Sequence, residues 1–162
     1  MKRLINLIYR TLQVLITLLM MVLVVPVVLQ IISRFTELIP RYIWTEEVAR
    51  FCFIWIIMIG AMIAVRDGMH FDLDVLPRPK TARGKALGRL FVHAAMLAVA
   101  LTFAVFGYRF ALFGYDQESE LTGLNMAFIH AAWPVAGIVF MLFLGEKLWA
   151  DIQAFRGRHG AA

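Results

Sequence analysis

The sequence predicts an all-α integral membrane protein with four transmembrane helices, and its composition and the distribution of its apolar residues both indicate this fold class. Hydrophobic residues make up 62% of the 162 residues and charged residues only 17%, a balance outside the range of soluble globular domains. The apolar residues fall into four stretches, each long enough to cross about 30 Å of hydrocarbon as a helix. None alternates apolar and polar residues with a period of two, so we expect no strands.

The predicted spans cover residues 11–33, 44–65, 90–113 and 124–144. The first span follows a basic start and is too long for the apolar core of a signal peptide, so we expect it to be retained. The longest linker, 67–88, contains Pro77 and Pro79 and has room for one short amphipathic interfacial helix near 71–76, but not for a second core. We therefore expect a single four-helix membrane domain over 1–162 with a disordered tail at 157–162.

The distribution of charge predicts the orientation. Twelve of the 16 basic residues lie before the first span, between the second and third, or after the fourth, whereas the loop 114–123 has three acidic residues and no basic one. The positive-inside rule then places both termini in the cytoplasm. The net charge of +5 fits anionic lipid headgroups, and we expect no nucleic-acid partner because the basic residues form no continuous patch.

The densest polar cluster precedes the second span and comprises Trp44, Glu46, Glu47 and Arg50. One interpretation is local: the Thr45 hydroxyl caps the helix, the carboxylates gain about 0.3 to 1 kcal/mol each from the macrodipole, Glu46 pairs with Arg50, and Trp44 is an interfacial anchor. The other is a polar knot, with Arg34 as a further member, that fixes the angle between the first two spans or docks a partner subunit. The sequence leaves both open.

Small and aromatic residues predict where helices pack. Trp55 belongs to a stripe at helical spacing on the second span, and Gly60 and Ala64 form a small-xxx-small pair that lets helix backbones approach closely. The third span repeats this pattern with Ala100, Ala104, Gly107 and Ala111. These stripes serve packing within the chain or contact with a partner.

Catalytic, cofactor and metal sites are not expected. His93 and His130 lie in spans, but their depths differ by roughly 16 Å, whereas two nitrogens on one haem iron are about 4 Å apart. Cys52 has no second cysteine to pair with. Pro26 and Pro134 interrupt single spans in halves that do not resemble each other, unlike the repeats of secondary transporters. A four-helix redox protein of cytochrome type and a small homo-oligomeric channel remain alternatives to an accessory subunit.

An ordered set of residues in the second span and its flanks resembles a known family. The set comprises Arg34, Trp44, Thr45, Glu46, Glu47, Arg50, Trp55, Gly60, Ala61, Arg66, Gly68, His70 and Asp74. It resembles the small integral membrane subunit of tripartite ATP-independent periplasmic (TRAP) transporters. The resemblance covers the chain well from about residue 30 to 76, and beyond that it is limited to the region of Pro134 and Gly137 in the fourth span.

This resemblance implies a non-enzymatic scaffold in the bacterial inner membrane with both termini cytoplasmic. It implies two partners, a larger membrane subunit that carries out sodium-coupled, elevator-type transport and a periplasmic binding protein that delivers an organic anion such as a carboxylate or sugar acid. Carried onto this chain, Trp44, Glu46, Glu47 and Arg50 would face the periplasm. Arg66, His70 and Asp74 would organise the cytoplasmic end of the second span.

Overall fold

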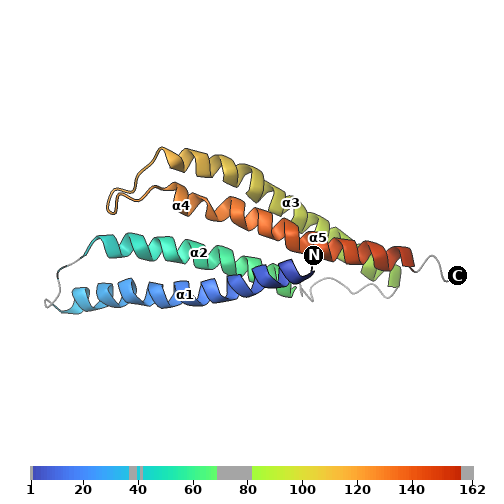
Figure 1. The fold of residues 1–162 in the computed structure, drawn as a ribbon, viewed down its shortest axis with the longest axis horizontal. Helices are drawn as coiled ribbons and strands as arrows, with labels where there is room; N and C mark the ends of the chain where they lie inside the picture. Colours follow the sequence, from blue (N-terminus) through green and yellow to red (C-terminus); the bar gives the residue numbers. More distant parts are fainter. Residues whose placement is uncertain (1, 37–39, 41, 69–81, 158–162) are drawn as a thin grey trace.

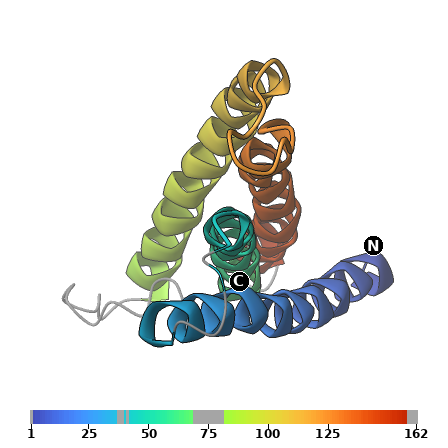
Figure 2. The same cartoon turned by 90° about the vertical axis from the view of Figure 1, so that its left-hand side faces the viewer.

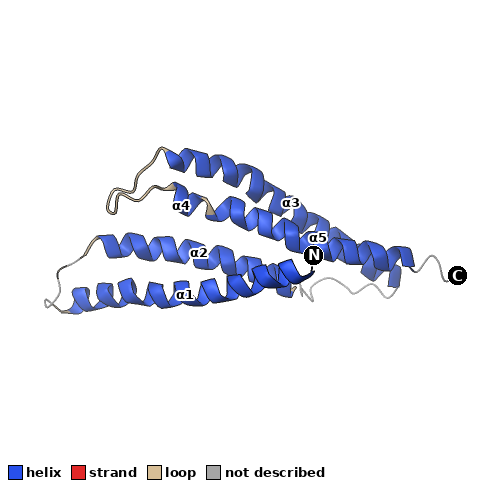
Figure 3. Ribbon diagram, in the orientation of Figure 1, coloured by secondary structure: helices blue, strands red, loops and turns tan. Residues whose placement is uncertain are grey.

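The computed structural model describes residues 2–36, 40, 42–68 and 82–157, and these residues form helices and connecting loops (Figure 3). The helices are α1 Lys2–Phe35, α2 Trp44–Asp67, α3 Ala82–Tyr115, the short α4 Ala127–His130, and α5 Ala132–Gly157. Four helical segments are long and apolar enough to cross a membrane. The predicted all-α fold with four spans is therefore confirmed for the described residues.

The helices extend beyond the predicted spans. Helix α1 begins at Lys2 rather than 11, α3 at Ala82 rather than 90, and α5 ends at Gly157 rather than 144. An apolar window marks only the hydrocarbon, whereas a helix continues into its basic flanks, whose side chains reach the headgroups. Gly157, expected in the tail, thus belongs to α5. The remaining tail and the predicted amphipathic helix at 71–76 lie outside the described residues.

The fourth span begins later than predicted because residues 116–126 form a compact turn. Ser119 N–H donates to Leu124 O at 2.9 Å, and Met126 N–H donates to Gln117 O at 2.9 Å. The helix then starts at α4 and is interrupted at Ala131. Pro134 lacks an N–H that could bond the carbonyl of His130, which explains the break.

The helices form two antiparallel hairpins that meet at one end and separate toward the other (Figure 1). One hairpin is α1 with α2, and the other is α3 with α4 and α5. We call the end with the start of α1 and the end of α5 the termini end, and the opposite end the loop end. Figure 2 shows α2 between α1 and the α3–α5 pair, and α2 contacts both α1 and α5.

Close approach between α3 and α5 depends on small residues. Ala100, Ala132 and Ala136 are fully buried. A Cβ on Gly137 would overlap the backbone nitrogen of Ala104 and lie 2.8 Å from Ala100 O. Three of the small residues predicted on the third span, Ala100, Ala104 and Gly107, therefore lie at this helix pair, where they let the backbones approach closely and increase van der Waals contact.

The remaining core lies where the two hairpins join. Ile59 and Met62 of α2 and Phe143 and Leu144 of α5 are its largest fully buried side chains. Helix α1 is peripheral, since 6% of its apolar window is buried in the chain, against 44% in the fourth span. Most of the surface of α1 is therefore available to lipid or to another protein.

Because α3 and α5 are in close contact at Gly137, a single added methyl group there should lower the stability of the chain. We expect Gly137→Ala to destabilise the chain by about 1 to 3 kcal/mol, because the added Cβ meets backbone atoms that cannot move independently. Gly145→Ala in the same helix is the matched control, since a Cβ there meets nothing within 4 Å. Reversible unfolding in mixed micelles measures both. Equal stability of the two variants would contradict this packing.

Candidate functional site

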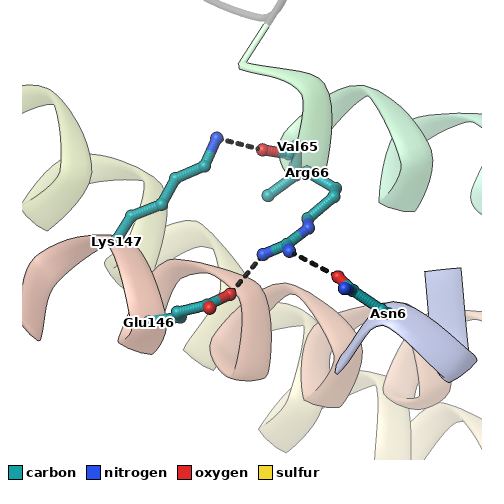
Figure 4. A network of polar contacts seen from close by, with 5 residues as sticks. All are labelled: Asn6, Val65, Arg66, Glu146 and Lys147. Atoms are coloured by element: carbon teal, nitrogen blue, oxygen red, sulfur yellow. Dashed lines mark hydrogen bonds and ion pairs between the residues drawn. The ribbon is translucent and has the colours of Figure 1, made fainter. Parts of the chain in front are cut away.

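The polar residues of the termini end join three helices through one arginine (Figure 4). Arg66, near the end of α2, forms an ion pair with Glu146 of α5. Its second guanidinium nitrogen donates to Asn6 Oδ1 of α1 at 3.1 Å. The guanidinium also lies 5.7 Å from the ring centre of Phe143. The planar guanidinium of an arginine has several N–H donors in fixed directions and can bind several partners at once. The ammonium of a lysine does not offer this geometry.

Neighbouring bonds extend this junction. Lys147 Nζ donates to the carbonyl of Val65 at 2.7 Å, and so binds one of the last carbonyls of α2, which have no partner within the helix. Tyr9 of α1 donates to Asp67 at 2.8 Å. Gly68 then ends α2 in the left-handed conformation, with φ 76°. We call Asn6, Arg66, Glu146 and Lys147 the termini-end cluster.

The sequence analysis grouped Arg66 with His70 and Asp74 at the cytoplasmic end of the second span but named no bonding partner for it. His70 and Asp74 lie outside the described residues, and among the described residues Glu146 and Asn6 bond to Arg66. A signal for Glu146 was present, because it is the only acidic residue between 121 and 150. A lone carboxylate at the edge of a span needs a cation as its partner. Arg66 is a candidate for this cation because it directly follows the apolar stretch of the second span.

At the loop end, the predicted capping role of Thr45 is wrong. The Thr45 hydroxyl donates to the carbonyl of Tyr42 at 2.7 Å rather than accepting from an amide. Ile43 is the residue before the helix, its conformation is already right-handed helical, and no side chain caps it. Thr45 thus lies inside the first turn, where a hydroxyl bonds back to a preceding carbonyl. Backbone bonds to Tyr42 and Ile43 occupy the amides of Thr45 and Glu46.

The two adjacent carboxylates point to different surroundings. Glu46 pairs with Arg50 at 3.7 Å, as the spacing predicted, and these side chains are 70% and 61% exposed. Glu46 also lines an open cavity together with Arg34. Glu47 is instead buried, with 7% exposure. The structure therefore brings Arg34, Glu46 and Arg50 together along one side and separates Glu47 from them.

Glu47 faces the turn between α3 and α4. Its carboxylate lies beside the hydroxyls of Ser119 and Thr122, which are 3.0 Å from each other. Ser119 is itself buried. One carboxylate oxygen, Oε2, has no hydrogen-bond partner among the described residues. Glu47 thus links the start of α2 to the second hairpin at the end where the hairpins separate.

The aromatic and small residues singled out on α2 have distinct neighbours. Trp44 is exposed beside Tyr42, with ring centres 6.2 Å apart, as suits a residue at the interface. Trp55 Nε1 donates to the carbonyl of Phe128 in α4 at 3.0 Å. A Cβ added at Gly60 would lie 3.6 Å from Ile16 Cδ1 of α1, an ordinary van der Waals distance, and Ala64 O accepts from the amide of Gly68.

The residues considered for redox chemistry are far from one another. His93 lines a small cavity with Gly68 and Lys147 at the termini end, whereas His130 stacks on Phe110 near the loop end, with ring centres 3.8 Å apart. Cys52 is buried in α2. Among the described residues, no group of three or more metal-ligating side chains is present.

The termini-end cluster predicts a coupling between Arg66 and Glu146. Both side chains are about three-quarters buried, so Arg66→Ala or Glu146→Ala should each cost about 1 to 3 kcal/mol, and the double variant less than their sum. A double-mutant cycle of unfolding in micelles measures the coupling. The exposed pair Glu46 and Arg50 is the control, with an expected coupling of about 0 to 1 kcal/mol. Additive effects at Arg66 and Glu146 would argue against the ion pair.

Known proteins resemble this chain over a region that includes the polar residues of α2 and α5 described above. The family model described as "Tripartite ATP-independent periplasmic transporters, DctQ component" matches residues 23–154. The chain is 28% identical over 116 residues to a putative TRAP transporter small permease protein of Haemophilus influenzae strain Rd, covering 70% of this chain and 71% of that protein. It is 25% identical over 121 residues to the sialic acid TRAP transporter small permease protein SiaQ of Vibrio cholerae, covering 74% and 69%.

A third relative is much longer than this chain. The sialic acid TRAP transporter permease protein SiaT of Haemophilus influenzae strain 86-028NP is 31% identical over 112 residues, which are 69% of this chain but 18% of that protein. With four spans and these relatives, the chain is a multi-pass protein of the bacterial inner membrane. The matched model covers most of its length, and the chain belongs to the DctQ-component family of tripartite ATP-independent periplasmic transporters.

Proposed function

We propose that this chain is the scaffold subunit of a sodium-coupled TRAP transporter. In this proposal a larger membrane subunit moves the substrate by an elevator mechanism, and a periplasmic binding protein delivers an organic anion, a carboxylate or a sugar acid. The chain is not an enzyme and enlarges the static part against which the transport domain moves. Both of its termini lie in the cytoplasm, so the loop end faces the periplasm.

The observation that carries this proposal is the absence of charge from the middle of every span. Residues 11–33, 51–65, 90–108 and 124–145 contain no Asp, Glu, Lys or Arg. Secondary transporters bind ions and substrate near the middle of the membrane, through broken helices and polar groups. A chain whose charges lie only toward the ends of its helices suits a supporting role.

The length of SiaT supports a larger membrane partner. Only 18% of that protein aligns with this chain, so SiaT joins a segment of this kind to a much longer remainder. A fused arrangement is expected when two parts work in contact. The exposed aliphatic surface of α1, including Val14, Leu18 and Val25, offers the area that such contact needs.

Reconstitution tests the role directly. Proteoliposomes with this chain, the large permease and the binding protein should take up a radiolabelled organic anion in response to a sodium gradient. Omission of this chain should reduce uptake to background, and the chain alone should give none. A large subunit that transports at the full rate without this chain, or transport by this chain alone, would refute the scaffold role.

A charge exchange at the loop end separates docking from local pairing. We expect Arg50→Glu, and also the exchanged pair Glu46→Arg with Arg50→Glu, to lower uptake and recovery of the large subunit by about tenfold. The stability of the isolated chain should change by only about 0.5 kcal/mol, since both side chains are exposed. Uptake, affinity purification and unfolding of the same preparations measure this. Full activity of the exchanged pair would mean that the two residues only pair locally.

A further inference from the structure

An open cavity of about 510 Å³ lies between the end of α1 and the start of α2, at the loop end. Its polar lining comprises Gln30, Ser33, Arg34, Tyr42, Thr45 and Glu46. Two observations distinguish it from an ordinary surface recess: it contains a buried donor without a partner, and it exposes charges of both signs.

The hydrogen-bond inventory of the lining shows what is left for a ligand. The hydroxyls of Ser33 and Thr45 already donate to the carbonyls of Gln30 and Tyr42, at 3.0 and 2.7 Å. Gln30 Nε2 is buried and has no hydrogen-bond partner among the described residues. A buried donor of this kind is costly unless something supplies an acceptor. Because Gln30 lines the cavity, rotation of its side chain would present this unused donor to an oxygen atom of a ligand.

The charged residues define the rest of the ligand. Arg34 forms no ion pair with any described residue, which leaves its guanidinium available to an anion. Glu46 meets Arg50 only at 3.7 Å and both are largely exposed, so the Glu46 carboxylate can still accept from a second cation. A guanidinium with an amide donor fits a phosphate, and a carboxylate fits an ammonium. The complementary ligand is a zwitterion with both groups.

The position of the cavity selects a membrane lipid as the source of this zwitterion. The exposed rings of Tyr42 and Trp44 mark the level of the interface, where aromatic residues gather in membrane proteins. Toward the hydrocarbon, Val27 and Val28 of α1 are exposed and can pack against acyl chains. We propose that this cavity binds the headgroup of phosphatidylethanolamine, with the phosphate at Gln30 and Arg34 and the ammonium at Glu46. This proposal does not depend on the transport role.

Native mass spectrometry of the full-length chain, with any co-purifying subunit retained, tests the site. Delipidated protein is titrated with dioleoyl phosphatidylethanolamine and, separately, with dioleoyl phosphatidylglycerol, which has the phosphate but no ammonium. We expect the first lipid to bind about tenfold more tightly, as one charge-assisted hydrogen bond would give. Glu46→Gln should remove this preference, and Arg34→Ala should weaken binding of both lipids. Equal binding of both lipids by the wild type would overturn the proposal.

Controls separate the site from general effects. Arg109→Ala removes an exposed cation from α3 and should leave lipid binding unchanged, whereas Gln30→Leu should weaken it. Equal weakening by Arg109→Ala and Arg34→Ala would mean that net charge alone is responsible and would refute the site. Soluble phosphoethanolamine is added as a competitor at the concentration of the lipid. If it displaces the lipid completely, the cavity recognises a free phosphoester and the lipid assignment is wrong.

Discussion

The arrangement of the two hairpins depends on the bonds that Arg66 makes at the termini end. This side chain belongs to α2 and reaches α5 through Glu146 and α1 through Asn6. Partial burial of the pair makes the contact specific, because a guanidinium removed from water must keep its partners. Lys147 adds a second link from α5 to the end of α2. Toward the loop end, α1 does not take part in comparable bonds among the described residues, and the hairpins separate.

The position of α2 follows from this junction. It is the only helix that contacts both α1 and α5 closely in the described part of the chain, and its buried residues Ile59 and Met62 belong to the same core cluster as Phe143 and Leu144. Hydrophobic burial does not drive helices together in lipid as it does in water, so shape and a few polar bonds must hold them. Between α3 and α5 the shape is supplied by Gly137 and the alanines opposite.

The sequence was sufficient for the fold class because the membrane imposes it. Four long apolar stretches with charges only toward their ends leave helices as the available structure for a backbone in hydrocarbon. The ends of the helices were harder to predict from the sequence, because hydropathy does not detect polar helical flanks such as the start of α3 at Ala82. Partners across helices could be predicted only where a lone charge requires one, as Glu146 does. The spacing of four residues predicted the pair of Glu46 and Arg50, but nothing local in the sequence connects Arg66 with Asn6.

The roles of Glu47 and Thr45 show the same limit. The two adjacent carboxylates looked equivalent in the sequence. Successive residues of a helix are rotated by about 100° around its axis, so Glu46 faces the cavity and Glu47 faces the α3–α4 turn. The capping interpretation of Thr45 failed because the connection before α2 already has helical geometry at Ile43. The direction of each side chain, and for Thr45 whether its hydroxyl donates or accepts, required the three-dimensional structure.

Unsatisfied polar atoms divide the molecule into an end that is complete and an end that is not. The buried side-chain atoms without a partner among the described residues are Gln30 Nε2, Glu47 Oε2 and His130 Nδ1, and all three lie toward the loop end. At the termini end, Arg66 and Lys147 have partners within the chain. Buried groups without partners are uncommon in folded proteins, since each is costly in a medium of low dielectric constant. The loop end is therefore where the proposed contacts with a lipid and with other subunits would supply partners that the described chain lacks.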